Sequence, residues 1–134
     1  MKMDFEEWTI QYVKHRDIFH KKLLAYKKEK DFVVFKFKDK THHYLIQKTI
    51  DESVFDKFKD KEHKTLVCGY KKENMDFVVK HWKKLVELQN FLIIFVDPDL
   101  GRKLLLNPQA HNSIADPESL ETGLKSMFNA GIEV

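Results

Sequence analysis

FLIIFV, residues 91–96, is the stretch that decides the fold. Every position is apolar, a pattern typical of a strand buried on both faces of a sheet that helices cover. DPDLG (97–101) follows with the residues of a tight turn, because Pro sets φ, Asp side chains bond nearby amides and Gly adopts a positive φ. RKLLLN (102–107) then predicts a partner strand, so we expect a hairpin here.

An amphipathic helix is predicted just before this hairpin. Asn74 is expected to cap it, and apolar side chains then recur at helical spacing. KTLVCGY (64–70) predicts another strand further upstream. After the hairpin, Asp116 and Pro117 predict the start of a last helix, which Gly131 would end.

The first half of the chain predicts a helix, a hairpin and a short helix. Asp4 is expected to cap a helix that runs to about Lys28 on an aromatic stripe. DFVVFKFKDKTHHYLIQK (31–48) predicts a hairpin that turns at residues 39–40. A capping-box pattern at residues 49–52 predicts the short helix.

The length of the first predicted helix bears on oligomeric state. At about 1.5 Å per residue it would be about 35 Å long, which is long for so small a domain. Either it bends near His15–Asp17, or it extends past the body and packs on a second copy. The second alternative predicts a homodimer through the N-terminal helix.

These elements follow the order α-β-β-α-β-α-β-β-α, and no repeat or flexible linker divides them. We therefore expect one domain over residues 1–134. Its predicted class is α+β (mixed α/β), with one mixed sheet of about five strands and helices packed on one or both faces.

Composition indicates a globular protein from a reducing compartment. Apolar residues make up 43% and charged residues 34%, as in a folded domain. The one cysteine cannot form an internal disulfide, and no apolar run approaches the roughly 18 residues that span a bilayer. We expect a cytoplasmic protein without a membrane segment, with Cys68 as a small buried hydrophobic residue.

Basic residues concentrate in the first two thirds of the chain. Residues 1–90 carry 21 Lys and Arg against 15 Asp and Glu, whereas residues 91–134 carry 3 against 6. Nearly all are lysine, which lacks the forked geometry with which arginine contacts phosphates and bases. This favours a solvated surface and leaves weak nucleic-acid binding as a hypothesis. The lysines assigned to that hypothesis are Lys21, Lys22, Lys36, Lys38 and Lys40.

The polar residues after the central strand allow two interpretations. Each has a local structural role in a turn or cap, and this is the interpretation we favour. However, Asp97 and Asp99 also leave the carboxyl end of a buried strand, where open sheets bind ligands. Together with His111 they would supply ligands for Mg²⁺ or Mn²⁺.

A second candidate site consists of Asp39 and of Glu62-His63-Lys64, which has the form Glu-x-Lys. The order α-β-β-β-α-β, counted from the first helix without the short one, is similar to the core of restriction-endonuclease-like nucleases. Those enzymes carry an Asp near the second strand and a Glu-x-Lys in the third. The resemblance implies that Asp39 and Glu62 hold a divalent metal while Lys64 steadies the attacking water. Here Glu-x-Lys precedes the apolar strand residues, whereas the family's follows them.

No well-spaced catalytic set accompanies these residues. We therefore expect a non-catalytic interaction domain that contacts protein or, weakly, nucleic acid, without a cofactor. The alternative is a metal-dependent nuclease or phosphodiesterase that uses Mg²⁺ or Mn²⁺. The sequence leaves open which of the two classes applies, and so whether the chain is an enzyme.

Overall fold

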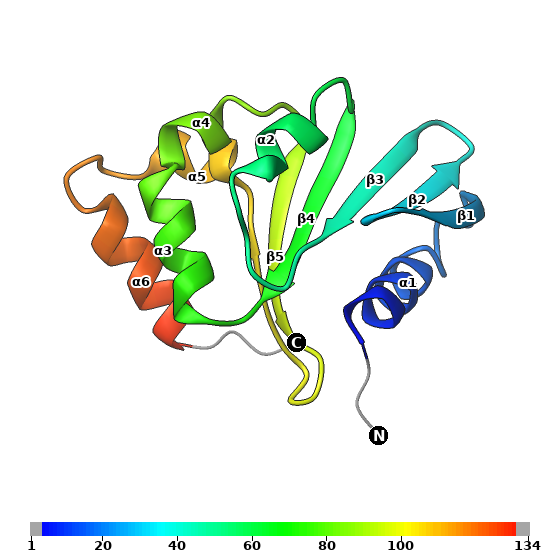
Figure 1. Cartoon of the computed structure of the whole chain (residues 1–134), viewed down its shortest axis with the longest axis horizontal. Coiled ribbons are helices and arrows are strands. Elements are labelled where there is room, and N and C mark those ends of the chain that lie inside the picture. The colour runs from blue at the N-terminus through cyan, green and yellow to red at the C-terminus, as the bar shows by residue number, and fades with distance from the viewer. Residues whose placement is uncertain (1–3, 131–134) are drawn as a thin grey trace.

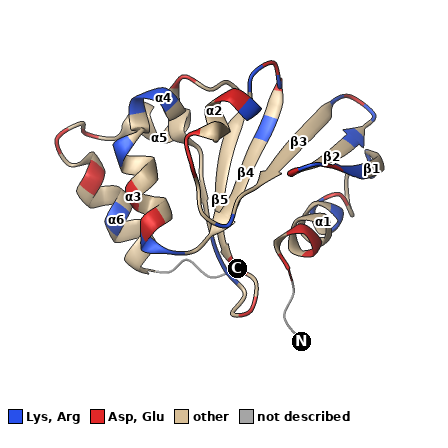
Figure 2. Ribbon diagram, viewed as in Figure 1, with Lys and Arg blue, Asp and Glu red and all other residues tan. Residues whose placement is uncertain are grey.

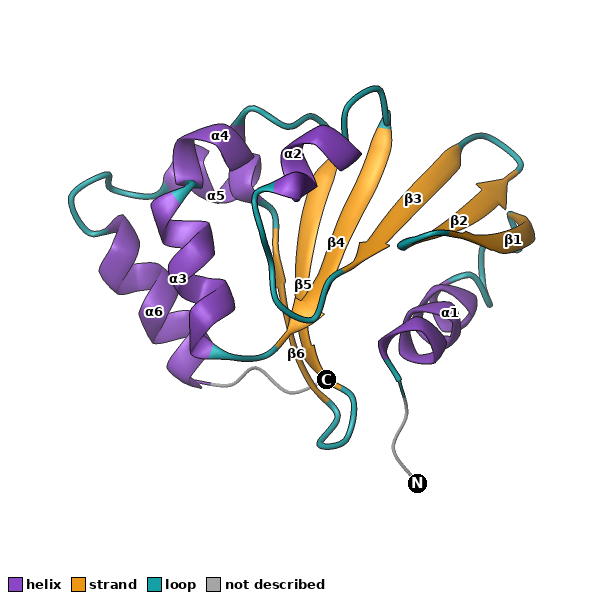
Figure 3. Cartoon of the chain, in the orientation of Figure 1, coloured by secondary structure: helices purple, strands orange, loops and turns teal. Residues whose placement is uncertain are grey.

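The computed structural model describes residues 4–130 and contains a six-stranded mixed sheet with helices on both faces (Figures 1 and 3). This confirms the predicted α+β class, with one strand more than expected. In chain order the elements are α1 (Phe5–Arg16), β1 (Leu23–Glu29), β2 (Phe32–Phe37), β3 (Thr41–Ile46), α2 (Ser53–Lys57), β4 (His63–Gly69), α3 (Lys72–Lys80), α4 (Trp82–Val86), β5 (Phe91–Asp97), β6 (Arg102–Leu106), α5 (Pro108–Ile114) and α6 (Leu120–Ala130).

The strands lie side by side in the order in which they occur in the chain, β1 to β6. β1, β2 and β3 form an antiparallel meander, β3, β4 and β5 are parallel, and β6 is antiparallel to β5. Parallel neighbours need a crossover, which α2 provides between β3 and β4 and the α3–α4 pair provides between β4 and β5. The predicted hairpin at residues 31–48 and the predicted strand near residues 64–70 are confirmed.

β5 is the interior strand that its sequence predicts. Ile93 and Phe95 pack on one face, in a cluster with side chains of α2, α3, α4 and α6. Ile94 and Val96 pack on the other face, in a cluster with Val13 of α1. Figure 1 shows the same division, with α1 alone on its side of the sheet. Two separate clusters explain why every position of this strand is apolar.

The long N-terminal helix is a wrong prediction, and the homodimer, which was argued from its length, stays a prediction. α1 ends at Arg16, and the chain then turns back to form β1. The Asp17 carboxylate accepts hydrogen bonds from the backbone amides of Lys22 and Leu23, both at 3.0 Å, and Lys21 has a positive φ of 52°. β1 is an edge strand with mostly exposed side chains, so no alternation of buried residues reveals it in the sequence.

The helix predicted from Asn74 is also different in detail. It consists of two helices that break at His81, whose φ and ψ are −105° and 20°. Asn74 does not cap it, because α3 already begins at Lys72 and the buried Asn74 side chain bonds backbone groups of Lys48, Ile50 and Gly69. An additional helix that the sequence did not predict, α5, follows β6: Asn107 caps it and Pro108 occupies its first position.

The ends of the remaining helices differ from expectation by a few residues. The capping box at residues 49–52 is absent, and the Asp51 side chain accepts from the amide of Ser53 instead. α6 begins at Leu120, after a turn in which Asp116 accepts from the amide of Glu118. Gly131, the predicted stop, lies outside the described residues. Cys68 is fully buried, as predicted.

Candidate functional site

A cavity of about 470 Å³ lies at the end of the sheet where the parallel strands begin. We call it the basic pocket. The end of α1, the α1–β1 loop, the end of β2 and the first residues of β3, β4 and β5 surround it. Its walls come from segments far apart in the sequence, from Val13 to Asn107. Its charged lining residues are Arg16, Asp17, Lys22, Asp39, Lys40 and Lys64.

The two carboxylates of the basic pocket already have partners. Both oxygens of Asp17 accept from backbone amides that close the α1–β1 loop. Asp39 pairs with the Lys22 ammonium at 3.3 Å, and this hydrogen bond is the main cause that lowers the pKa of Asp39. Both side chains of that pair are about half exposed, so the pair is weak and easily exchanged for another ligand. The net charge around the cavity is positive, which suits an anion.

The floor of the basic pocket is neutral. His42 Nε2 lies 2.8 Å from the hydroxyl of Thr65, and the His42 ring lies 4.6 Å from the ring of Tyr44. Burial, helped by the nearby Lys40, lowers the pKa of His42 to about 3. Burial also raises the pKa of Tyr44 to about 12. Neither group changes charge near neutral pH, so this floor offers hydrogen bonds and ring faces rather than acid–base catalysis.

Lys64 is buried, and its ammonium donates hydrogen bonds to backbone carbonyls. It donates to the carbonyls of Lys61 at 2.9 Å and of Gln89 at 2.6 Å, and burial lowers its pKa. These bonds tie the loop before β4 to the loop before β5. The structure therefore gives the lysine of the Glu-x-Lys motif a structural role in the wall of the cavity.

The predicted nuclease set is only partly brought together. Asp39 and Lys64 line the same pocket, but the Glu62 side chain is 83% exposed and lies 3.9 Å from the His63 ring. Because β1 is present, the motif stands at the start of the fourth strand, not in the third. The third strand, β3 (THHYLI), contains no Glu-x-Lys. The family pattern is therefore not reproduced at these residues.

The predicted metal set is not brought together. Asp97 accepts from the amides of Asp99 and Leu100 in the β5–β6 turn, the structural role that we favoured. His111 lies on α5 beside Trp82, with ring centroids 5.8 Å apart. α5 follows Leu106, which pairs with Ile93 near the other end of β5. Within residues 4–130, no three His, Cys, Asp or Glu side chains gather closely enough to hold a metal ion.

Four of the five predicted nucleic-acid lysines, all except Lys36, lie in the two loops that border the basic pocket. Lys22 and Lys40 line it, and the Lys38 amide donates to the Lys22 carbonyl at 2.9 Å, which joins the α1–β1 and β2–β3 loops. Lys36 lines a separate hollow together with Val34 and Thr41. Figure 2 shows basic residues along the β1–β2 side of the sheet. We call Arg16, Lys21, Lys22, Lys38 and Lys40 the basic rim.

An exposed aromatic residue lies in the same loop as Lys21 and Lys22. Phe19 is 92% exposed, and its neighbour Ile18 is 54% exposed. No separate signal in the sequence predicts this exposure, because Phe19 falls at helical spacing with the apolar residues of the expected long helix. Only the end of α1 at Arg16 places it in a surface loop.

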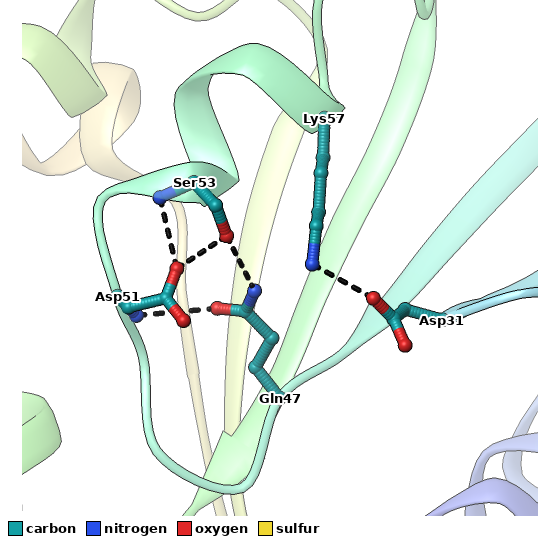
Figure 4. A network of polar contacts seen from close by, with 5 residues as sticks. All are labelled: Asp31, Gln47, Asp51, Ser53 and Lys57. Atoms are coloured by element: carbon teal, nitrogen blue, oxygen red, sulfur yellow. Dashed lines mark hydrogen bonds and ion pairs between the residues drawn. The ribbon is translucent and has the colours of Figure 1, made fainter.

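The opposite end of the parallel strands carries a polar network that holds a loop (Figure 4). Gln47 accepts from the amide of Asp51 and donates to the hydroxyl of Ser53, and Asp51 in turn accepts from Ser53. These bonds from Ser53 lower the pKa of Asp51. Lys57 pairs with Asp31 at 2.7 Å. The polar groups of this network bond one another, so we place the candidate functional site at the basic pocket.

Comparison with protein family models, curated proteins and solved structures finds no match for this chain. Among the helices of residues 4–130, none is long and apolar enough to cross a membrane.

Proposed function

We propose that this protein is a non-catalytic interaction domain that binds single-stranded nucleic acid weakly through the basic rim and Phe19. The observation that carries the proposal is that Arg16, Lys22 and Lys40 line one cavity, while Lys21, Lys38 and the 92% exposed Phe19 lie in the loops beside it. Basic grooves with accessible aromatic residues are the usual means of binding single strands without sequence preference.

The charge distribution supports this proposal. Residues 14–40 carry ten Lys and Arg against four Asp and Glu, whereas the rest of the chain carries 14 against 17. The positive charge therefore belongs to the segment that forms the rim. Lysine contacts with phosphates are independent of sequence and sensitive to salt. The one arginine of the rim donates to the hydroxyl of Tyr12 at 2.7 Å, so the proposal includes no specific base recognition.

A metal-dependent nuclease is the weaker proposal. It would need a divalent ion at Asp39 and Glu62, yet Asp39 pairs with Lys22 and Glu62 points into solvent. The cytoplasmic location inferred from the single cysteine also stays a proposal, which fractionation of cells would test. The homodimer was argued from a long first helix, whereas α1 ends at Arg16. Light scattering at high concentration tests the homodimer directly.

Fluorescence anisotropy of a labelled oligothymidylate tests the preferred function. Affinity should fall steeply between about 50 and 200 mM salt, as expected when phosphate contacts release counterions. Combined replacement of Lys21, Lys22 and Lys40 by Ala should weaken binding and lower the salt slope by about 2, since each phosphate contact on a single strand contributes roughly 0.7.

The matched control replaces Lys59, Lys72 and Lys80 by Ala, which removes the same charge from exposed positions away from the rim. Equal losses of affinity in both triple variants would show that only the net charge of the protein matters, which would contradict the proposal. Adding Mg²⁺ or Mn²⁺ separates the second function: shortening of the oligonucleotide that the Glu62→Gln variant abolishes would identify a nuclease.

A further inference from the structure

We infer that the basic pocket is a subsite for one nucleotide, with the phosphate at the basic rim and the base inside the cavity. The inference rests on the proposed function and goes beyond it, because surface contacts alone would not require a cavity. At about 470 Å³ the basic pocket is within the size range of small-molecule sites, about 300 to 1,000 Å³.

The inner walls fit a nucleobase. Val13, Phe37 and Leu92 supply apolar surface, and the rings of His42 and Tyr44, whose centroids lie 4.6 Å apart, add aromatic surface. His42 is uncharged at neutral pH, so it does not compete with the rim for the phosphate. A flat heteroaromatic ring gains both from apolar contact and from stacking in such surroundings.

Two asparagines give the cavity polar groups that could bond the edge of a base. Asn90 and Asn107 both line it. The Oδ1 atom of Asn107 accepts from the amide of Ala110 and caps α5, which leaves its NH₂ group as the donor for a ligand. An amide offers donors and an acceptor, and base edges present the complementary groups.

The mouth of the cavity fits a phosphate. Lys22 and Lys40 line it from the two loops that the Lys38–Lys22 backbone bond holds together, and Arg16 lines it from the end of α1. The half-exposed pair of Lys22 with Asp39 can give way to a stronger anion, because such a pair contributes little. Phosphate contacts by ammonium and guanidinium groups are charge-assisted and stronger than neutral hydrogen bonds.

The test uses the full chain and three probes: thymidine 5′-monophosphate, thymidine and inorganic phosphate. Amide shifts in a ¹H–¹⁵N spectrum should move at Val13, Leu92 and Asn107 with the monophosphate. Each of the other two probes should bind about tenfold more weakly, since each lacks one set of contacts. Inorganic phosphate binding as tightly as the monophosphate would overturn the inference, because the pocket would then serve an anion without a base.

Two variants locate the subsite. Leu92→Trp should fill the cavity without changing charge, abolishing monophosphate binding while oligothymidylate affinity at the basic rim falls only a few-fold. If that variant does not melt cooperatively, Lys40→Ala takes its place and should weaken the monophosphate about tenfold. Lys36→Ala is the control for lost charge, since Lys36 lies outside the pocket.

The remaining outcomes separate the two proposals. If oligothymidylate binds in a salt-dependent way and the monophosphate does not move the pocket amides, the subsite is overturned and the proposed function stands. If the monophosphate binds and the oligonucleotide does not, the subsite stands and the single-strand function is overturned.

Discussion

The imidazole Nε2 of His42 lies 2.8 Å from the hydroxyl of Thr65, at the floor of the basic pocket where β3 and β4 begin. Thr65 is fully buried, so the hydrogen bond holds the His42 ring against the sheet in its neutral form. The pKa of His42 falls from its ordinary value of 6.5 to about 3, with burial as the main cause. This relationship makes the stability of the fold depend on pH.

We expect the His42→Gln variant to lose less stability in mild acid than the native protein does. In the native protein the folded pKa lies below the unfolded one, so the unfolded chain binds the proton first as pH falls. The free energy of unfolding is therefore lost progressively from about pH 6.5 toward 3, by up to about 1.4 kcal/mol per pH unit from this group. Urea unfolding at several pH values, with the exposed His15→Gln as control, measures the difference. Parallel pH profiles for all three proteins would contradict it.

Asn74→Ala should destabilise the fold by about 2 to 4 kcal/mol. The Asn74 amide donates to the carbonyls of Lys48 and Gly69, both at 2.8 Å, and accepts from the amide of Ile50 at 2.9 Å. Its removal leaves buried backbone groups without partners, which costs more than a hydrogen bond contributes. Urea unfolding checks this, and Glu73→Ala, an exposed neighbour on α3, should change little. A loss of less than about 0.5 kcal/mol would show that water replaces the side chain.

Two glycine substitutions should change stability in opposite directions. Gly101 has a φ of +71° in the β5–β6 turn, so Gly101→Ala should cost about 1 to 2 kcal/mol from the backbone alone. Gly123 lies within α6, so Gly123→Ala should stabilise by about 0.5 to 1 kcal/mol. An added Cβ meets no atom within 4 Å at either site, which makes the pair a matched comparison. Changes of the same sign in thermal melts would contradict the backbone explanation.

Phe19→Ala should weaken oligothymidylate binding without changing stability. Stacking of a base on an aromatic ring contributes about 1 to 3 kcal/mol, so affinity should fall by roughly fivefold to a hundredfold. Ile114→Ala is the control, because Ile114 is 84% exposed on α5, away from the basic rim. Anisotropy titration and a thermal melt measure the two effects. Unchanged affinity would remove Phe19 from the interface.

The sequence predicts those elements whose burial or turns produce a recognisable pattern of residue types. The strand at residues 91–96 is apolar throughout because it packs on both faces, and the hairpin at residues 31–48 shows its turn residues directly. β1 was not predicted, because its exposed residues match the pattern of a helix. Pairing with β2 outweighs this local preference and makes the segment a strand. Asn107 caps α5 and Pro108 occupies its first position, and this helix was not predicted from the sequence.

The candidate site could be predicted only in fragments. Short motifs single out Asp39 and Lys64, which line one cavity, but Asp39 pairs with Lys22 and Lys64 donates to backbone carbonyls. The lysines of the rim are evident from composition, whereas their meeting point depends on where α1 ends. Phe19 and His42 acquire their environments from tertiary contacts that no local pattern encodes.

Because each strand pairs with its neighbour in the chain, this sheet can be assembled in the order of translation. No ladder has to wait for a distant segment, so loop closure costs little entropy at each step. The β1–β3 meander and α1 leave the ribosome first, and with them the whole basic rim. A growing chain would thus present its cationic surface before the apolar strands β4 and β5 have been synthesised.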